Sequence, residues 1–126
     1  MKIAFATDNG ITFVERHFGD AKHYLIYEIN EQKISFVRKI DNSLEAEEMH
    51  ADPKKAKGIS SLLFQEDVAV VVSKIFGPNI ARIRKKFVCI VSKEKDIVKS
   101  IDNIQGNYNA ILSEWKNGEE RKHLIL

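Results

Sequence analysis

The stretch VAVVVSKIFGPNIARIRKKFVCIV (68–91) decides the fold. It begins and ends with unbroken apolar runs, 68–72 and 87–91, in which no polar residue alternates. Such runs are typical of central strands that are covered on both faces of a parallel sheet. Between them, residues 80–87 read as a short helix that follows a Gly-Pro pair. The stretch therefore predicts two parallel strands joined by a helix, with a right-handed crossover.

Strands are also predicted on the N-terminal side of this unit. Residues 23–29 and 33–40 are rich in aromatic and β-branched residues, and only the residues NEQ separate them. Because this connection is short, the two segments are expected to pair as an antiparallel hairpin. The apolar run 2–6 is closed by the turn sequence TDNG and predicts one more strand. The expected sheet is thus mixed, with about five strands.

Helices are predicted between and after these strands. Asp52 and Pro53 are typical of an N-cap and a first helical residue, and apolar side chains at helical spacing follow them, so residues 53–65 are expected to be helical. Residues 94–104 and 107–118 also carry apolar side chains at helical spacing.

The chain is expected to be one α/β domain. Residues 1–118 hold the predicted sheet and the helices that flank it. Residues 119–126 form a C-terminal tail whose last residues are apolar, and this tail could dock as a strand or meet a partner. The oligomeric state, monomer or homodimer, stays open.

Composition narrows the class of protein. Of 126 residues, 44% are hydrophobic and 30% are charged, which is ordinary for a soluble domain. A net charge of +2 makes nucleic acid an unpromising partner. The single cysteine excludes an internal disulfide and favours a reducing compartment. No apolar run approaches the ~20 residues of a membrane helix. We therefore expect a cytoplasmic protein with no membrane partner.

Three segments of the sequence are informative when they are taken together and in this order: MKIAFATDNG (1–10), HFGDAKHYLIYEI (17–29) and VAVVVSKIFGPNIARIRKKF (68–87). Together they resemble the dinitrogenase iron-molybdenum cofactor biosynthesis family of nitrogenase accessory factor-like domains, over roughly residues 1–118. The resemblance implies a ribonuclease-H-like α/β fold. It also implies binding or carriage of an iron–sulfur cofactor precursor, with or without molybdenum. The implied partners are this cluster and the proteins that donate or accept it.

The His-Phe-Gly triplet is the first candidate site. Neutral imidazole is a good ligand for iron, so His17 is a candidate for direct contact with the cluster. A loop histidine can equally hydrogen-bond its own turn, and both alternatives stay open. If His17 is a ligand, Phe18 would pack beneath it and Gly19 would let the backbone turn tightly. His50 would be a second metal ligand if its acidic loop folds over the end of the sheet.

Gly77, Pro78 and Asn79 are the candidates for the other side of the site. They follow a central strand and precede a helix, and open α/β sheets bind ligands at the carboxyl ends of their strands. The start of a helix favours anions, and Asn79 could add a side-chain donor. The basic residues that follow read either as a solvated helix face or as part of the site. They are Arg82, Arg84, Lys85 and Lys86.

The cysteine count limits the chemistry. Stable iron–sulfur clusters are ordinarily held by several thiolates, whereas Cys89 is alone and lies in a buried-strand pattern. Any cluster would therefore be bound transiently with few protein ligands, as a non-catalytic carrier requires.

Two other functions are compatible with the sequence. One is a metal-free regulatory module that binds an anion or nucleotide at the Gly-Pro turn. The other is a metal-dependent nuclease built around Asp8. A nuclease needs several converging carboxylates, whereas turn chemistry already explains Asp8 in TDNG.

Overall fold

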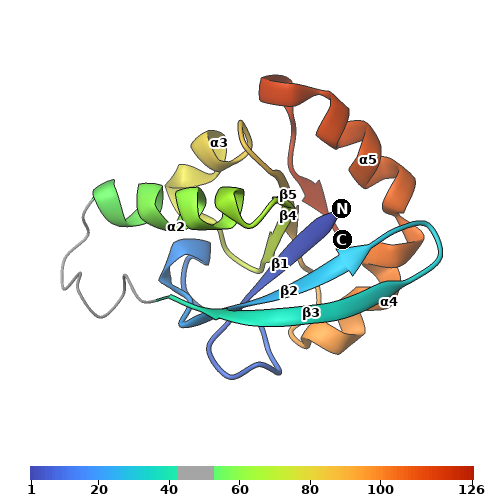
Figure 1. Cartoon of the computed structure of the whole chain (residues 1–126), viewed down its shortest axis with the longest axis horizontal. Helices are drawn as coiled ribbons and strands as arrows, with labels where there is room; N and C mark the ends of the chain where they lie inside the picture. Colours follow the sequence, from blue (N-terminus) through green and yellow to red (C-terminus); the bar gives the residue numbers. More distant parts are fainter. Residues whose placement is uncertain (43–52) are drawn as a thin grey trace.

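A mixed sheet of six strands, in the order β3-β2-β1-β4-β5-β6, forms the centre of the computed structural model, which describes residues 1–42 and 53–126 (Figure 1). The hairpin strands β2 and β3 pair antiparallel with each other, and β2 pairs antiparallel with β1. From β1 onward, β4, β5 and β6 are all parallel. The predicted hairpin and the predicted parallel unit are both present. The strands are β1 (Lys2–Thr7), β2 (His23–Ile29), β3 (Ile34–Asp41), β4 (Val68–Ser73), β5 (Val88–Val91) and β6 (Leu124–Ile125).

Helices cover both faces of the sheet. Ile59 and Leu63 of α2 and Ile83 of α3 belong to the apolar cluster on one face. Ile97, Ile104 and Ile111, from α4 and α5, belong to the cluster on the other face. The strand β4 lies between the two clusters and is buried along its whole length, as its uninterrupted apolar sequence predicts. The α-helices are α2 (Pro53–Gln65), α3 (Ile80–Ile83), α4 (Ile97–Gly106) and α5 (Tyr108–Lys116).

Three short 3-10 turns complete the description: η1 (Phe18–Asp20), η2 (Gly77–Asn79) and η3 (Gly118–Glu120). Two of them, η1 and η2, fall on the predicted site motifs. The predicted helix 53–65 coincides with α2. No helix in residues 1–42 or 53–126 is long and apolar enough to cross a membrane.

The prediction of five strands is wrong by one. Leu124–Ile125 forms β6 and pairs with Ile90 and Val91 of β5. The C-terminal residues therefore belong to the sheet. Two residues are too few for an alternation of side chains to indicate a strand. For this reason the sequence predicts residues 119–126 as a tail that could dock as a strand or meet a partner.

A buried arginine holds this C-terminal segment in place. Arg121 is 8% exposed, and its Nε and Nη2 donate to the Trp115 carbonyl at 3.2 and 3.0 Å. Its Nη1 donates to the carbonyls of Lys85 at 3.0 Å and Arg84 at 3.4 Å. The guanidinium also lies 4.3 Å from the centre of the Trp115 ring. Arg121 thus joins the ends of α3 and α5 to the last strand.

Candidate functional site

The two predicted motifs lie on loops that follow neighbouring parallel strands. The loop after β1 spans residues 8–22, and the loop after β4 spans residues 74–79. The chain continues from β1 to β2 on one side and from β4 to β5 on the other. Open α/β sheets bind ligands where the connections diverge in this way. The loops touch, because the Phe18 amide donates to the Ile75 carbonyl at 2.8 Å.

The side chain of His17 packs directly on Gly77. A Cβ added to Gly77 would lie 2.7 Å from both Cε1 and Nδ1 of the imidazole. Gly77 also has φ +73°, a left-handed conformation that other residues adopt only with strain. Glycine is therefore required here twice, for its backbone conformation and for the space that the ring occupies.

The His17 imidazole has no hydrogen-bond partner among residues 1–42 and 53–126, although the side chain is exposed. The turn is closed by the backbone instead, since the Asp20 amide donates to the His17 carbonyl at 2.9 Å. The alternative in which the side chain bonds its own turn is therefore not what the structure shows. A neutral imidazole without such a partner keeps one nitrogen lone pair for a ligand.

Phe18 anchors this loop in the core. It is fully buried, and its ring stacks on Phe76 with centroids 5.3 Å apart. Its edge contact with Tyr24 has the same centroid distance, and the Tyr24 hydroxyl donates to the Phe18 carbonyl at 2.7 Å. Phe18 and Phe76 directly follow and precede the motif residues His17 and Gly77. The aromatic stack thus fixes the backbone on both sides of the histidine–glycine contact.

The turn at Gly19 does not depend on glycine, and the predicted contact of this residue with a cofactor stays a prediction. Its φ is not positive, and a Cβ at this position would meet no atom within 4 Å. The backbone of η1 turns in an ordinary 3-10 conformation that any residue adopts. The conformationally required glycine of the site is Gly77.

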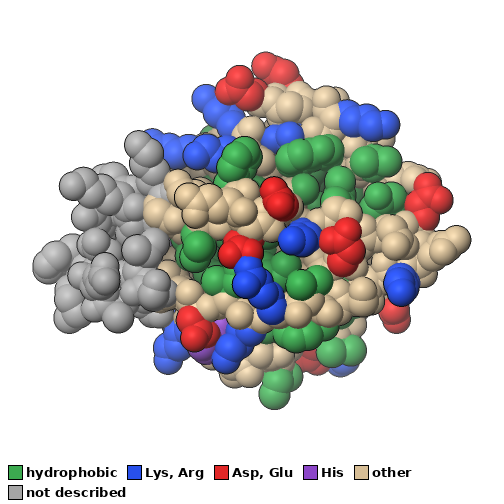
Figure 2. Space-filling model, in the orientation of Figure 1, with side chains coloured by type: hydrophobic (Ala, Val, Ile, Leu, Met, Phe, Trp, Pro, Cys, Tyr) green, Lys and Arg blue, Asp and Glu red, His purple; other side chains and the backbone are tan. Residues whose placement is uncertain are grey.

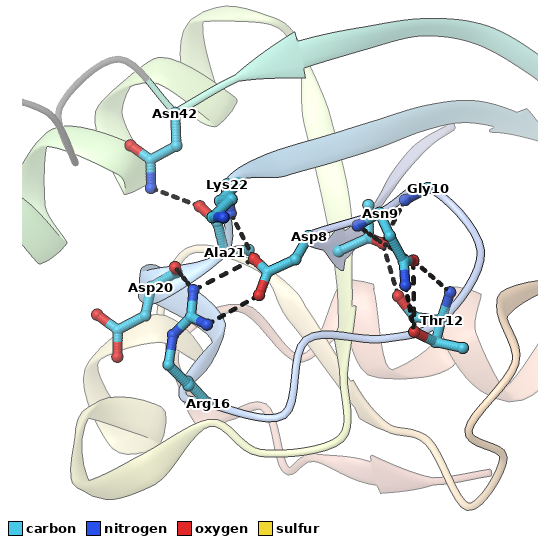
Figure 3. A network of polar contacts seen from close by, with 10 residues as sticks. Asp8, Asn9, Gly10, Thr12, Arg16, Asp20, Ala21, Lys22 and Asn42 are labelled. Carbon is cyan, nitrogen blue, oxygen red and sulfur yellow. Dashed lines mark hydrogen bonds and ion pairs between the residues drawn. The ribbon is translucent and has the colours of Figure 1, made fainter.

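A polar network fixes the ends of the His17 loop (Figure 3). The Asp8 carboxylate accepts from Arg16 Nη1 at 2.8 Å and Nη2 at 3.2 Å, and from the Lys22 amide at 2.9 Å. Arg16 Nη2 also donates to the Asp20 carbonyl at 2.8 Å. Asp8, at the end of β1, therefore joins two residues that flank His17. Both of its oxygens are engaged in this structural task, and the nuclease alternative stays untested.

Asn42 holds the same loop from the opposite side. Its Nδ2 donates to the carbonyls of Gly19 at 3.2 Å and Ala21 at 2.9 Å, and its amide donates to the Lys22 carbonyl at 2.9 Å. Sequence reasoning missed Asn42 and Arg16. Neither lies in a recognisable motif, and only their contacts reveal the role.

The Gly-Pro-Asn turn is built differently from the prediction. Residues Gly77–Asn79 form a 3-10 turn, and the helix α3 that follows has only four residues. The Ile80 amide is already bonded to the Gly77 carbonyl, and Pro78 has no amide hydrogen. The macrodipole and free amides expected of a long helix are thus reduced. Asn79 is exposed and stays a predicted contact.

The other candidate ligands are engaged or buried. Cys89 is fully buried, and this burial raises the pKa of its thiol to about 12, so the metal-binding thiolate does not form at neutral pH. His23 Nδ1 lies 2.8 Å from Asp41 Oδ1, and His123 Nδ1 accepts from Arg84 at 3.1 Å. His50 lies outside the described residues. Within them, no three His, Cys, Asp or Glu side chains are grouped to hold a metal ion.

Comparisons with known proteins place the chain in a family and a fold. A family model described as "Dinitrogenase iron-molybdenum cofactor" matches residues 1–107. A comparison with curated proteins finds no match. A crystal structure described as a "putative dinitrogenase" from Methanocaldococcus jannaschii is similar with a TM-score of 0.55 and 21% identity, over 85% of this chain and 89% of that one. At this identity the likeness shows a shared α/β fold, and the ribonuclease-H-like label stays a prediction.

Proposed function

Because the chain belongs to the dinitrogenase iron-molybdenum cofactor family, we propose that it binds and carries an iron–sulfur cofactor precursor and does not itself catalyse a reaction. The precursor, with or without molybdenum, is the cargo. In this proposal the cargo binds at the contact between His17 and Gly77, with iron coordinated by the imidazole.

One observation supports this assignment above the others. His17 is exposed and has no hydrogen-bond partner among the described residues, yet the ring rests on Gly77 and the adjacent Phe18 is fixed in the core. A histidine that only fills a turn has no need of this support. An imidazole that must present a ring nitrogen to a metal benefits from it, because the ligand is oriented before binding.

The small number of ligands suits a carrier. Stable clusters are ordinarily held by several thiolates, and the buried Cys89 does not supply one. Among residues 1–42 and 53–126, His17 is the imidazole that combines exposure with an unused side chain. A cluster held by one or two protein ligands can leave readily for an acceptor, whereas a cluster held by four would remain.

The test is anaerobic gel filtration of the apo-protein mixed with an isolated iron–sulfur cofactor precursor, with iron and molybdenum assayed across the protein peak. Wild type should co-elute with metal, and His17→Ala should not. His123→Ala is the matched control, because it also removes an imidazole from the surface but lies at the far end of the sheet. A His50→Ala variant measures whether the predicted second ligand contributes.

The outcomes separate the alternatives. Metal in the peak of wild type and His123→Ala but not of His17→Ala supports the proposal. Equal metal in all variants would keep a carrier but remove the assignment to His17. If no protein binds metal and wild type instead binds a phosphorylated ligand, the metal-free module replaces the carrier.

A further inference from the structure

A cluster of cations lies away from the His17 site. Residues 82–86 and 121–123 contribute it, and the two segments touch through Arg121, which bonds the carbonyls of Arg84 and Lys85. Figure 2 shows Lys and Arg side chains gathered over α3. We call this cluster the basic patch. Its members are Arg82, Arg84, Lys85, Lys86 and Lys122.

The basic patch is at the opposite end of the sheet from the His17 site. Lys85 and Lys86 lie just before β5, with only Phe87 between Lys86 and the strand, and Lys122 lies two residues before β6. The His17 and Gly77 loops follow β1 and β4. Since these four strands are parallel, the patch lies toward their amino ends and the site lies at their carboxyl ends. Lys85, Lys86 and Lys122 therefore lie away from the predicted cluster site.

The arginines differ in whether they form a salt bridge with an acidic side chain. Arg16 pairs with Asp8, and Arg38 pairs with Glu66. The remaining arginines, Arg82, Arg84 and Arg121, all lie in or under the patch, and no salt bridge joins any of them to an acidic side chain among the described residues. One acid lies beside the patch: the Glu114 carboxylate accepts from the Lys122 amide at 2.9 Å and interacts with the charges of Lys122 and Arg121. Arg82, Lys85 and Lys86 have no salt bridge among the described residues.

Helix capping does not account for these cations. Basic side chains at the end of a helix ordinarily bond or screen its last carbonyls. Here Arg121 bonds the carbonyls of Arg84 and Lys85, and the Lys86 and Phe87 amides bond that of Ile83. The side chains of Arg82, Lys85 and Lys86 are exposed and are not needed for this purpose.

The support beneath the patch is rigid. Arg121 is buried against Trp115, and Arg84 Nη1 donates to His123 Nδ1 at 3.1 Å. These contacts hold in place the backbone that carries the exposed cations before any partner binds. We infer that the basic patch docks an acidic face of a partner protein, independently of cargo binding at His17.

Protein is favoured over nucleic acid as the occupant. A nucleic-acid groove is typically a track of cations with aromatic side chains on which bases stack. The patch segments 82–86 and 121–123 contain no Phe, Tyr or Trp, and the exposed acids Glu119 and Glu120 directly precede the second segment. A phosphate backbone that runs beyond the patch would meet these carboxylates, whereas a compact acidic face would not.

The test compares two triple variants of equal net charge. The patch variant is Arg82→Glu, Lys85→Glu and Lys86→Glu. The control variant, Lys93→Glu, Lys95→Glu and Lys116→Glu, reverses three exposed lysines elsewhere. Binding of a fluorescein-labelled poly-glutamate peptide is followed by fluorescence anisotropy at about 50 and about 200 mM NaCl. Thermal unfolding of each variant verifies the fold.

The wild-type protein should bind the peptide saturably, more weakly at the higher salt. The patch variant should bind at least about tenfold more weakly, and the control should stay within about threefold of wild type. His17→Ala should bind like wild type, so failure here is distinct from failure of the carrier proposal. Equal weakening in both triple variants, no saturable binding, or tighter binding of a DNA duplex under the same conditions would overturn the inference.

Discussion

The two ends of the parallel strands differ in how they use polar side chains. At the carboxyl ends of β1 and β4, Asp8 is bonded to Arg16 and to the Lys22 amide, and His17 is the one described histidine that presents an exposed, unused ring. At the amino ends of β5 and β6, several cations are exposed together, and Arg82, Lys85 and Lys86 have no salt bridge among the described residues.

This difference separates two kinds of recognition. The carboxyl end is built like a ligand site, because hydrogen bonds and aromatic stacking fix the loops that carry one available metal ligand. The amino end is built like a docking surface, because the buried Arg121 holds the backbone beneath several exposed lysine and arginine side chains. Predictions that disturb one end should therefore leave the other unchanged, and the four that follow run from the largest expected effect to the smallest.

Phe18→Ala should have the largest effect. It removes a fully buried ring that stacks on Phe76 and contacts Tyr24, and such truncations destabilise by about 3–5 kcal/mol. Phe36→Ala is the matched control, since Phe36 is 56% exposed and should lose less than about 1.5 kcal/mol. Urea unfolding measures both. Similar losses in the two variants would mean that Phe18 does not anchor the site loop.

Gly77→Ala should disturb the site more specifically. Its φ of +73° makes alanine strained, at about 1–2 kcal/mol, and its new Cβ would overlap the His17 ring. The exposed ring can swing away, so the overlap should displace His17 and add little to the loss of stability.

Gly10→Ala isolates the backbone part of this effect. Gly10 has φ +80°, and a Cβ there meets nothing within 4 Å. Both variants should lose similar unfolding free energy, but only Gly77→Ala should shift the His17 imidazole resonances in a ¹H–¹³C NMR spectrum and weaken binding of the cluster. Unchanged resonances in Gly77→Ala would disprove the ring–glycine contact.

Cys89 gives a pH-dependent prediction that involves the amino end. Burial raises the pKa of its thiol to about 12, and the nearby Arg84 and Arg121 oppose this shift. In the unfolded chain the thiol ionises near pH 9, so between about pH 9 and pH 12 the unfolded state loses a proton that the native state keeps. The contribution of the Cys89 thiol to the free energy of unfolding is therefore complete below about pH 9 and is lost as the pH rises from there toward about pH 12.

The Cys89→Ala variant separates this effect from other titrations. Wild type should lose on the order of 1 kcal/mol more than the variant between about pH 8 and about pH 10. Chemical denaturation at the two pH values measures the difference. Parallel losses in the two proteins, or rapid reaction of native Cys89 with a thiol reagent at pH 8, would show that the thiol is not buried.

Much of the fold follows from sequence because its signals are local. The apolar runs of β4 and β5, the short hairpin connection and the N-cap before α2 each indicate an element without reference to the rest of the chain.

The strand β6 has no such local signal. Its crossover from β5 also passes over the face of α4 and α5, whereas the earlier crossovers pass over the face of α2 and α3. The connections into β4, β5 and β6 all advance in the same direction along the sheet. The connection from β5 to β6 therefore has the opposite hand to the earlier ones, and no local sequence pattern encodes this hand.

The site was predictable in its motifs but not in its assembly. His17 and Gly77 stand out as a loop histidine and a glycine after a buried strand, yet their contact depends on which strands are neighbours. Arg16 and Asn42 are ordinary surface residue types until the fold places them against Asp8 and Gly19. Roles that arise from tertiary hydrogen bonds to the backbone leave no trace in residue type or spacing.

Asp8→Asn tests this unpredicted part and should have the smallest effect on stability. The variant keeps the shape of the side chain but removes the charge that pairs with the partly exposed Arg16, and such pairs contribute about 0.2–1 kcal/mol. The effect on the loop should exceed this, because Asp8 joins residues on both sides of His17. Amide hydrogen exchange at residues 16–22 should accelerate, while exchange in β5 stays unchanged. The Asp102→Asn variant, which changes an exposed aspartate, is the control.

If Asp8→Asn instead abolished a Mg²⁺-dependent cleavage of nucleic acid and left exchange in the loop unaltered, Asp8 would be a catalytic ligand. The carboxyl end of the sheet would then be an active site rather than a carrier's binding site.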